Sequence, residues 1–164
     1  MLRAVVIVVL IGTFIGAMMP ARESRPSSAR EREAPAKAAV ARNPGDPVRI
    51  ERRSDGHFYV HGEINGQIAR FLVDTGASMV ALTVEDAERL GVEFSPDRFG
   101  IVGTGASGPV RGQRVMLNEV VVEGRQALDV EGAVIEGLEI SLLGQSFLSR
   151  LGSIEMSGDQ MVLN

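Results

Sequence analysis

The sequence contains no cysteine, which excludes a disulfide framework, a thiolate zinc site and a cysteine nucleophile. It also has no tryptophan and one tyrosine, so it offers few aromatic rings on which nucleic-acid bases could stack. Residues 43–164 carry 10 basic against 18 acidic side chains, and such an acidic segment repels a phosphate backbone. The composition therefore argues against nucleic acid as a partner.

Long apolar runs are absent except near the N-terminus, where residues 4–19 are uncharged and strongly apolar. The run is slightly short for a spanning helix of roughly 20 residues, and the small residues that a signal peptidase needs are poorly placed around residues 17–21. We expect residues 1–21 to form a single-pass membrane anchor. A removed signal peptide and a buried core helix are the alternatives.

Large apolar side chains are also scarce in residues 22–47, which are rich in Ala, Arg, Glu, Pro and Ser. Such a segment buries too little surface to offset the entropy of ordering, so we expect a flexible tether. Its flank at residues 22–42 has 6 basic against 3 acidic residues, and a positive flank favours the cytoplasmic side of a membrane. Charge alone therefore argues against export of residues 43–164.

From residue 48 onward the sequence changes to short β-rich runs separated by glycine-containing turns, which is typical of one all-β domain at residues 48–164. Asp55-Gly56, Asn65-Gly66 and Ser157-Gly158 are candidate hairpin turns. The expected strands are residues 48–52, 57–64, 68–73, 79–82, 100–103, 111–122, 126–134, 153–156 and 160–163.

Helical signals in this domain are few. Residues 83–90 have a candidate cap at Thr83, an apolar edge at Ala87 and Leu90, and a stop at Gly91. A second short helix is expected at residues 145–151, after Gly144. The sequence thus predicts an all-β fold with one or two short helices.

One segment of the sequence contains the candidate catalytic residue. Residues 71–78 read Phe-Leu-Val-Asp-Thr-Gly-Ala-Ser, so the acid Asp74 follows directly after three apolar residues, where burial of a charge is costly. Gly76 permits a tight turn, Thr75 supplies a hydroxyl, and Ser78 is placed to donate to the carboxylate. On its own, the tripeptide Asp-Thr-Gly is also compatible with an ordinary turn at the end of a strand.

Peptide hydrolysis by carboxyl groups alone requires two of them sharing a proton, one acting as a base and the other as an acid. Asp-Thr-Gly occurs once in this sequence. A second carboxyl group would have to come from another copy of the chain, related by a two-fold axis.

Residues 73–78 resemble the active-site loop of the retropepsin-like aspartic proteases, and the similarity is greatest to bacterial membrane-anchored members. The resemblance extends over residues 57–164 and implies a small closed β-barrel. It makes Asp74 the catalytic acid and base, with loop support from Thr75, Gly76, Ala77 and Ser78.

Two further segments fit the resemblance. Leu142, Leu143 and Gly144 are similar to the family's apolar element that packs beneath the active-site loop. Gly103, Thr104 and Gly105 open a glycine-rich stretch suited to the flap that closes over a bound peptide. The flap has no aromatic residue, in contrast to the family's pattern.

The resemblance implies an aspartic endopeptidase that is active as a homodimer on peptide or protein substrates and needs no cofactor. It also implies a bacterial inner-membrane protein with a periplasmic domain, contrary to the charge rule. The alternative is a non-catalytic peptide-binding or dimerisation module on the same scaffold. His57 and His61 lie four residues apart on an expected strand, roughly 13 Å from Cα to Cα, which is too far for a shared ion, so no metal is expected.

Overall fold

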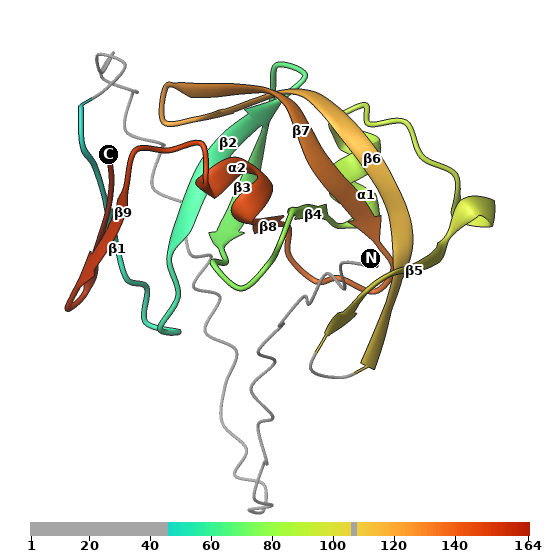
Figure 1. The fold of residues 1–164 in the computed structure, drawn as a ribbon, viewed down its shortest axis with the longest axis horizontal. Coiled ribbons are helices and arrows are strands. Elements are labelled where there is room, and N and C mark those ends of the chain that lie inside the picture. Colours follow the sequence, from blue (N-terminus) through green and yellow to red (C-terminus); the bar gives the residue numbers. More distant parts are fainter. Residues whose placement is uncertain (1–45, 106–107) are drawn as a thin grey trace, which may run out of the picture.

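The computed structural model describes residues 46–105 and 108–164, and these form two β-sheets with short helices (Figure 1). The elements in chain order are β1 (Val48–Glu51), β2 (Tyr59–Ile64), β3 (Gln67–Val73), β4 (Val80–Leu82), α1 (Val84–Arg89), η1 (Pro96–Arg98), β5 (Gly100–Gly105), β6 (Gly108–Val122), β7 (Arg125–Ile135), β8 (Leu142–Leu143), α2 (Gln145–Leu148), β9 (Ile154–Ser157) and β10 (Gln160–Leu163). The expectation of a mostly β domain with few short helices is confirmed.

The larger sheet has the strand order β2-β3-β8-β4-β7-β6-β5, and β6 also pairs with β2. The smaller sheet has the order β1-β10-β9. Its central strand β10 is the last strand described, and it joins β1, the first strand described, to β9. The two ends of the domain are thus held together by backbone hydrogen bonds.

Alternation along the strands places one face of each sheet in the core. In β1 the buried residues Val48 and Ile50 alternate with exposed Arg49 and Glu51, as expected for a strand with one face in solvent. The main core lies between the sheets and α1, and a second, smaller apolar cluster surrounds Ala77, Met79 and Leu142.

Local signals in the sequence predicted several elements correctly. Asn65 and Gly66 both have positive φ and form the two-residue turn of the β2–β3 hairpin. The Thr83 hydroxyl accepts a hydrogen bond of 3.0 Å from the Asp86 amide, which caps α1, and Gly91 follows the helix with φ +66°.

Other expectations were wrong. Asp55-Gly56 is not a hairpin turn, because β1 pairs with β10 and β2 pairs with β3. The second helix ends at Leu148 and not at Leu151. Leu142–Leu143 is a strand of only two residues, too short for a sequence pattern to reveal.

The membrane expectation falls outside the described residues. No helix within residues 46–105 and 108–164 combines the length and the hydropathy needed to cross a bilayer. The apolar run at residues 4–19 and the expected tether lie outside the part that the structure describes, apart from the last residues of the tether.

The close approach of β6 to β7 at Gly112 gives a test of the fold. A Cβ on Gly112 would lie 2.2 Å from the Val134 carbonyl oxygen, whereas a Cβ on Gly100, its cross-strand neighbour, would meet nothing within 4 Å. We expect Gly112→Ala to lower the free energy of unfolding by about 1–3 kcal/mol through overpacking, and Gly100→Ala to change it little. Urea denaturation of both variants measures this, and equal midpoints would contradict the packing described.

Candidate active site

The Asp74 backbone is fixed by two neighbouring segments. Asp74 directly follows β3, whose last residue, Val73, donates its amide to the Phe58 carbonyl at 2.9 Å. The amide of Asp74 itself donates to the Leu143 carbonyl at 3.1 Å. Because β8 runs parallel to β3, with Leu72 beside Leu142 and Val73 beside Leu143, the loop that begins at Asp74 sits on β8.

The loop turns sharply at Asp74. Its Oδ1 accepts a hydrogen bond of 2.8 Å from the Gly76 amide, and its carbonyl oxygen accepts one of 3.3 Å from the Ala77 amide. The first bond is that of an Asx-type turn, and the second closes a four-residue β-turn. Asp74 is half-buried, whereas Thr75 and Gly76 are exposed, so the turn presents one edge of the loop to the surface.

Gly144 allows the loop to pack closely. A Cβ at this position would lie 2.2 Å from the Met79 carbonyl oxygen and 2.8 Å from that of Ala77, distances that no side chain tolerates. The two residues before it, Leu142 and Leu143, are buried in β8 between β3 and β4. The structure therefore places Leu142, Leu143 and Gly144 directly against the Asp74 loop.

Helix α2 holds the rest of the loop through polar contacts. The Gln145 side chain donates from Nε2 to the Thr75 carbonyl at 3.0 Å, and the backbone amide of Gln145 donates to the Ala77 carbonyl at 2.8 Å. The Ser146 hydroxyl accepts from the Val80 amide at 3.0 Å and donates to the Glu131 carbonyl at 2.7 Å. Both ends of the loop are thus tied to one short helix.

Ser78 differs from the sequence-based expectation. Its hydroxyl oxygen is buried and makes no hydrogen bond with any residue that the structure describes, so it does not donate to the Asp74 carboxylate. Its backbone carbonyl instead accepts from the Ser146 amide at 3.1 Å. The contact to Asp74 is made by the Gly76 amide, which lies closer along the chain.

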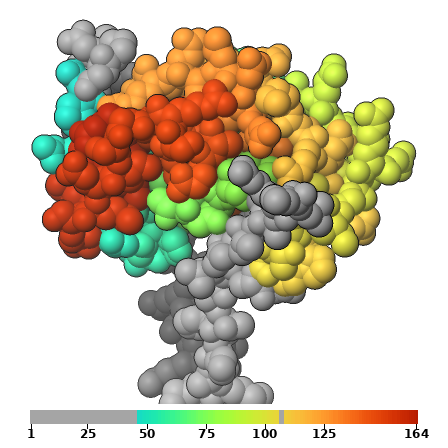
Figure 2. Space-filling model, viewed as in Figure 1, coloured from blue at the N-terminus to red at the C-terminus, as the bar shows by residue number. Residues whose placement is uncertain are grey.

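The candidate flap is the hairpin formed by β5 and β6. Gly103 pairs with Val110, Thr104 with Pro109 and Gly105 with Gly108, after an irregularity between Ile101 and Gly103. Residues 106 and 107 lie outside the described part of the chain. In Figure 2 the segment near residue 75 (green) reaches the surface between the start of β2 (teal) and this hairpin (yellow).

A small apolar pocket of about 20 Å³ lies between the loop and the base of the flap. Its lining residues are Ala77, Met79, Ala81, Val110, Ala133, Ile135, Leu138 and Leu142. Sequence reasoning missed Ala81, Ala133 and Ile135, because small apolar residues in strands are also what an ordinary core requires. A larger hollow of about 380 Å³, lined by Asn65 and by residues 91–93 and 113–118, contains no residue of the loop or flap.

Beside the loop, Asp55 organises a polar cluster. Its carboxylate accepts from the His57 amide at 3.0 Å and from the Tyr59 hydroxyl at 2.8 Å, and both bonds hold the pKa of Asp55 below its usual value. His57 and His61 are exposed, and no group of three or more potential metal ligands occurs among residues 46–105 and 108–164.

This arrangement, a mostly β domain that presents one Asp-Thr-Gly turn above a tightly packed glycine, has known counterparts. The model of the family described as gag-polyprotein putative aspartyl protease matches residues 60–150, which is more than half of the chain. A crystal structure of a retropepsin-like aspartic protease from Rickettsia conorii superposes with a TM-score of 0.61 at 37% identity, covering 71% of this chain and 89% of that one. The chain therefore belongs to the retropepsin-like aspartic proteases, as the resemblance of residues 73–78 indicated.

Other relatives are more distant or uncharacterised. EIAV protease in complex with the inhibitor HBY-793 matches with a TM-score of 0.51 at 21% identity over 64% of this chain and 97% of that one, which shows the fold. The uncharacterized protein RP867 of Rickettsia prowazekii (strain Madrid E) is 38% identical over 116 residues, or 70% of this chain, and a Sinorhizobium protein from the cobV 5′ region is 36% identical over 118 residues, or 71%. The aligned region is 50% of the former and 51% of the latter, so the match spans about half of these curated relatives.

The polar cluster next to the loop can be tested through Tyr59, the sole tyrosine of the chain. Burial raises the pKa of Tyr59, and the hydrogen bond and negative charge of Asp55 raise it further, while Arg70, whose guanidinium carbon lies 4.0 Å from the ring centroid, lowers it. We expect Asp55→Asn to lower the pKa of Tyr59, because the phenolate no longer faces a carboxylate, and Arg70→Gln to raise it.

Ultraviolet titration of the phenol measures both shifts without interference from tryptophan. Asp159→Asn, at a residue paired with Arg52, serves as the control and should leave the pKa of Tyr59 unchanged. A shift of the same sign in Asp55→Asn and Arg70→Gln would contradict the arrangement.

Proposed function

We propose that this chain is one subunit of a homodimeric aspartic endopeptidase, in which two Asp74 carboxyl groups activate a water molecule for peptide hydrolysis. The observation that carries the proposal is the placement of Asp74 in a surface turn that is fixed from below by Leu143 and Gly144, within a member of this protease family. A rigid support of this kind is what a catalytic carboxyl group needs to hold its position.

The chemistry explains why a dimer is required. One carboxylate takes a proton from the water as it attacks the peptide carbonyl carbon, and the other carboxylic acid protonates the carbonyl oxygen. Collapse of the tetrahedral intermediate then transfers a proton to the leaving nitrogen. Each chain supplies one Asp-Thr-Gly turn, so the pair forms only when two copies place their Asp74 residues on either side of a two-fold axis.

The surroundings of the loop favour a peptide as the substrate. The pocket beneath the flap is lined by apolar side chains such as Met79, Val110 and Leu142, and it adjoins the residues that follow Asp74. At about 20 Å³ the pocket has room for a small apolar group of a substrate, such as a methyl. The hairpin of β5 and β6 would cover the bound chain, with Gly103, Thr104 and Gly105 as part of the flap near its tip.

The proposal also covers the shape of the larger sheet and the N-terminal residues 1–47. The β2–β6 pairing, over Gly62–Ile64 and Val120–Val122, supports closure of the larger sheet into a small barrel. Residues 1–21 would anchor the chain in a bacterial inner membrane and residues 22–47 would serve as a tether, with the domain at 48–164 in the periplasm. Anchoring two copies in one membrane raises their effective concentration and so favours the dimer.

Replacement of Asp74 tests the catalytic role directly. We expect the full chain to cleave an unfolded protein at mildly acidic pH, and Asp74→Asn to lower the rate by roughly 10²–10⁴-fold or more. Asp97→Asn, in η1 and outside the loop, is the matched control and should retain full activity.

Circular dichroism should show that Asp74→Asn keeps the fold. Proteolytic activity that survives this substitution would contradict the proposal. A dimer that binds peptides but never cleaves them would instead identify a binding module on the same scaffold, and mapping cleavage products in cells with and without Asp74 separates that case from a protease with a single cellular substrate.

A further inference from the structure

The hollow of about 380 Å³ is a groove along the middle of β6, and it belongs neither to the Asp74 loop nor to the flap. One wall is formed by residues 113–118 of β6 and the other by residues 91–93, which follow α1, with Asn65 of the β2–β3 turn also in the lining. The two walls are joined near one end, because the Gln113 side chain accepts a hydrogen bond of 2.8 Å from the Ser95 amide.

This part of β6 is an edge of the larger sheet. The strand pairs with β5 up to Gly112 and with β2 from Val120 onward. Within the part of the chain that the structure describes, residues 113–119 therefore have a partner strand only on the side of β7. Seven residues of a strand extend over roughly 20 Å. The backbone groups on the other side offer an extended polypeptide a template for binding by strand addition.

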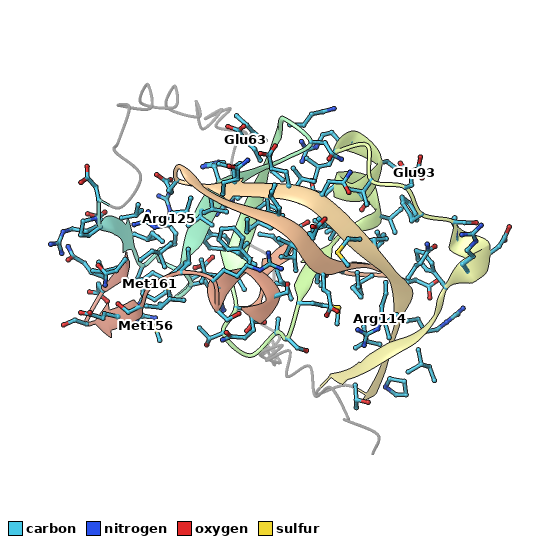
Figure 3. The ribbon with its side chains drawn as sticks, turned by 45° about the horizontal axis from the view of Figure 1, so that its top comes forward. Glu63, Glu93, Arg114, Arg125, Met156 and Met161 are labelled. Atoms are coloured by element: carbon cyan, nitrogen blue, oxygen red, sulfur yellow. The ribbon has the colours of Figure 1, made fainter. Side chains whose placement is uncertain are left out.

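The rim of this groove is acidic. Glu93 lines it, Glu63 lies on β2, which bounds the groove at one end, and Glu88 lies in α1, just before the second wall. Figure 3 labels Glu63 and Glu93 along the upper side of the domain. The one cationic side chain in the lining, Arg114, donates to the Val102 carbonyl at 3.1 Å. The groove therefore favours a segment that carries positive charge.

The chain enters the described part of the domain beside the same strand. Arg125 donates from Nη2 to the Asp46 carbonyl at 2.6 Å, and Arg125 is opposite Val122 of β6. Val122 is three residues from Glu119, the last residue of the unpaired edge, which corresponds to roughly 10 Å along a strand. A segment that lies a few residues before Asp46 can therefore reach the groove.

Proline and charge select one such segment. Proline has no amide to donate to a neighbouring strand, and the chain before Asp46 contains two runs of eight residues without it, residues 27–34 and 36–43. Residues 27–34 carry two arginines and two glutamates and so have no net charge. Residues 36–43 carry Lys37 and Arg42 and no acid, and four of the other residues are alanines, whose small side chains suit a groove with two walls.

We infer that the groove along β6 is an internal docking site for residues 36–43, which bind as a strand added to residues 113–119. Lys37 and Arg42 meet the acidic rim, while backbone hydrogen bonds to the edge of β6 hold the segment. Docking shortens the chain that connects the domain to residues 1–21, and so limits how far the domain moves from them. The inference does not require catalysis by Asp74.

The absence of cysteine allows the docked segment to be trapped in the full chain carrying Asp74→Asn. We expect Asn118→Cys, at an exposed position of β6, to form an intramolecular disulfide with Ala39→Cys or Ala41→Cys under mild oxidation, because docking brings the Cα atoms within roughly 7 Å. Glu51→Cys replaces Asn118→Cys in the control. Glu51 is also exposed and is closer along the chain, so an undocked segment would meet it more often.

Peptide mapping by mass spectrometry identifies the disulfides. Cross-linking to position 51 as fast as to position 118 would contradict docking. Disulfides that join two chains, with a rate that rises with protein concentration, would assign the groove to the segment of another copy and would overturn the internal site.

Hydrogen exchange tests the role of charge without any added thiol. Lys37→Glu combined with Arg42→Glu reverses the charge of the segment, and we expect the amides of residues 113–119 to exchange roughly threefold faster or more, because the segment leaves the edge of β6. Arg30→Glu combined with Arg32→Glu is the matched control, with the same change of charge in the other proline-free run. Equal exchange in the wild type and in the first variant, or equal acceleration in both variants, would overturn the inference.

These outcomes are distinguishable from those of the proposed function. Selective cross-linking at position 118 in a chain whose wild type never cleaves a protein would support docking and contradict the catalytic proposal. Cleavage by a wild type in which position 118 shows no preference over position 51 would overturn docking alone.

Discussion

The site depends on the close packing of Gly144 against the loop that begins at Asp74. With no side chain at this position, the Met79 and Ala77 carbonyls approach the Gly144 backbone, and α2 can start directly beneath the loop. From there Gln145 reaches the Thr75 carbonyl and Ser146 joins Val80 to Glu131. The loop after β3, strand β4 and strand β7 are thus joined to α2 by the two residues that follow this glycine.

The polar contacts of the loop are made almost entirely by the backbone. The Asp74 carboxylate is held by an amide, and the surrounding carbonyls are held by Gln145 and by amides of α2. Backbone groups occupy fixed positions once the chain is folded, so they orient a carboxyl group without the entropy cost of ordering long side chains. The Ser78 hydroxyl, which the sequence suggested for this role, is left without a protein partner among the described residues.

The sequence predicted those features whose cause is local. The Asn65-Gly66 turn and the Thr83 cap depend on a few adjacent residues, and Asp74 was identifiable because an acid after a buried strand is unusual. Features that depend on pairing between distant segments were not predictable. The pairing of β1 with β10 cannot be read from either strand alone, so Asp55-Gly56 has the local pattern of a hairpin turn without forming one, and β8 is recognisable as a strand only from its neighbours β3 and β4.

The central position of β10 in the small sheet has a consequence for the order of folding during synthesis. Strand β1 is made first, yet its hydrogen-bonding partner is the last strand described, so the entire domain must leave the ribosome before β1 can pair. The buried residues Val48 and Ile50 remain uncovered until then. Because β9 also pairs with β10, the whole small sheet is completed at the same late step, and no part of it can form while the central domain is still being made.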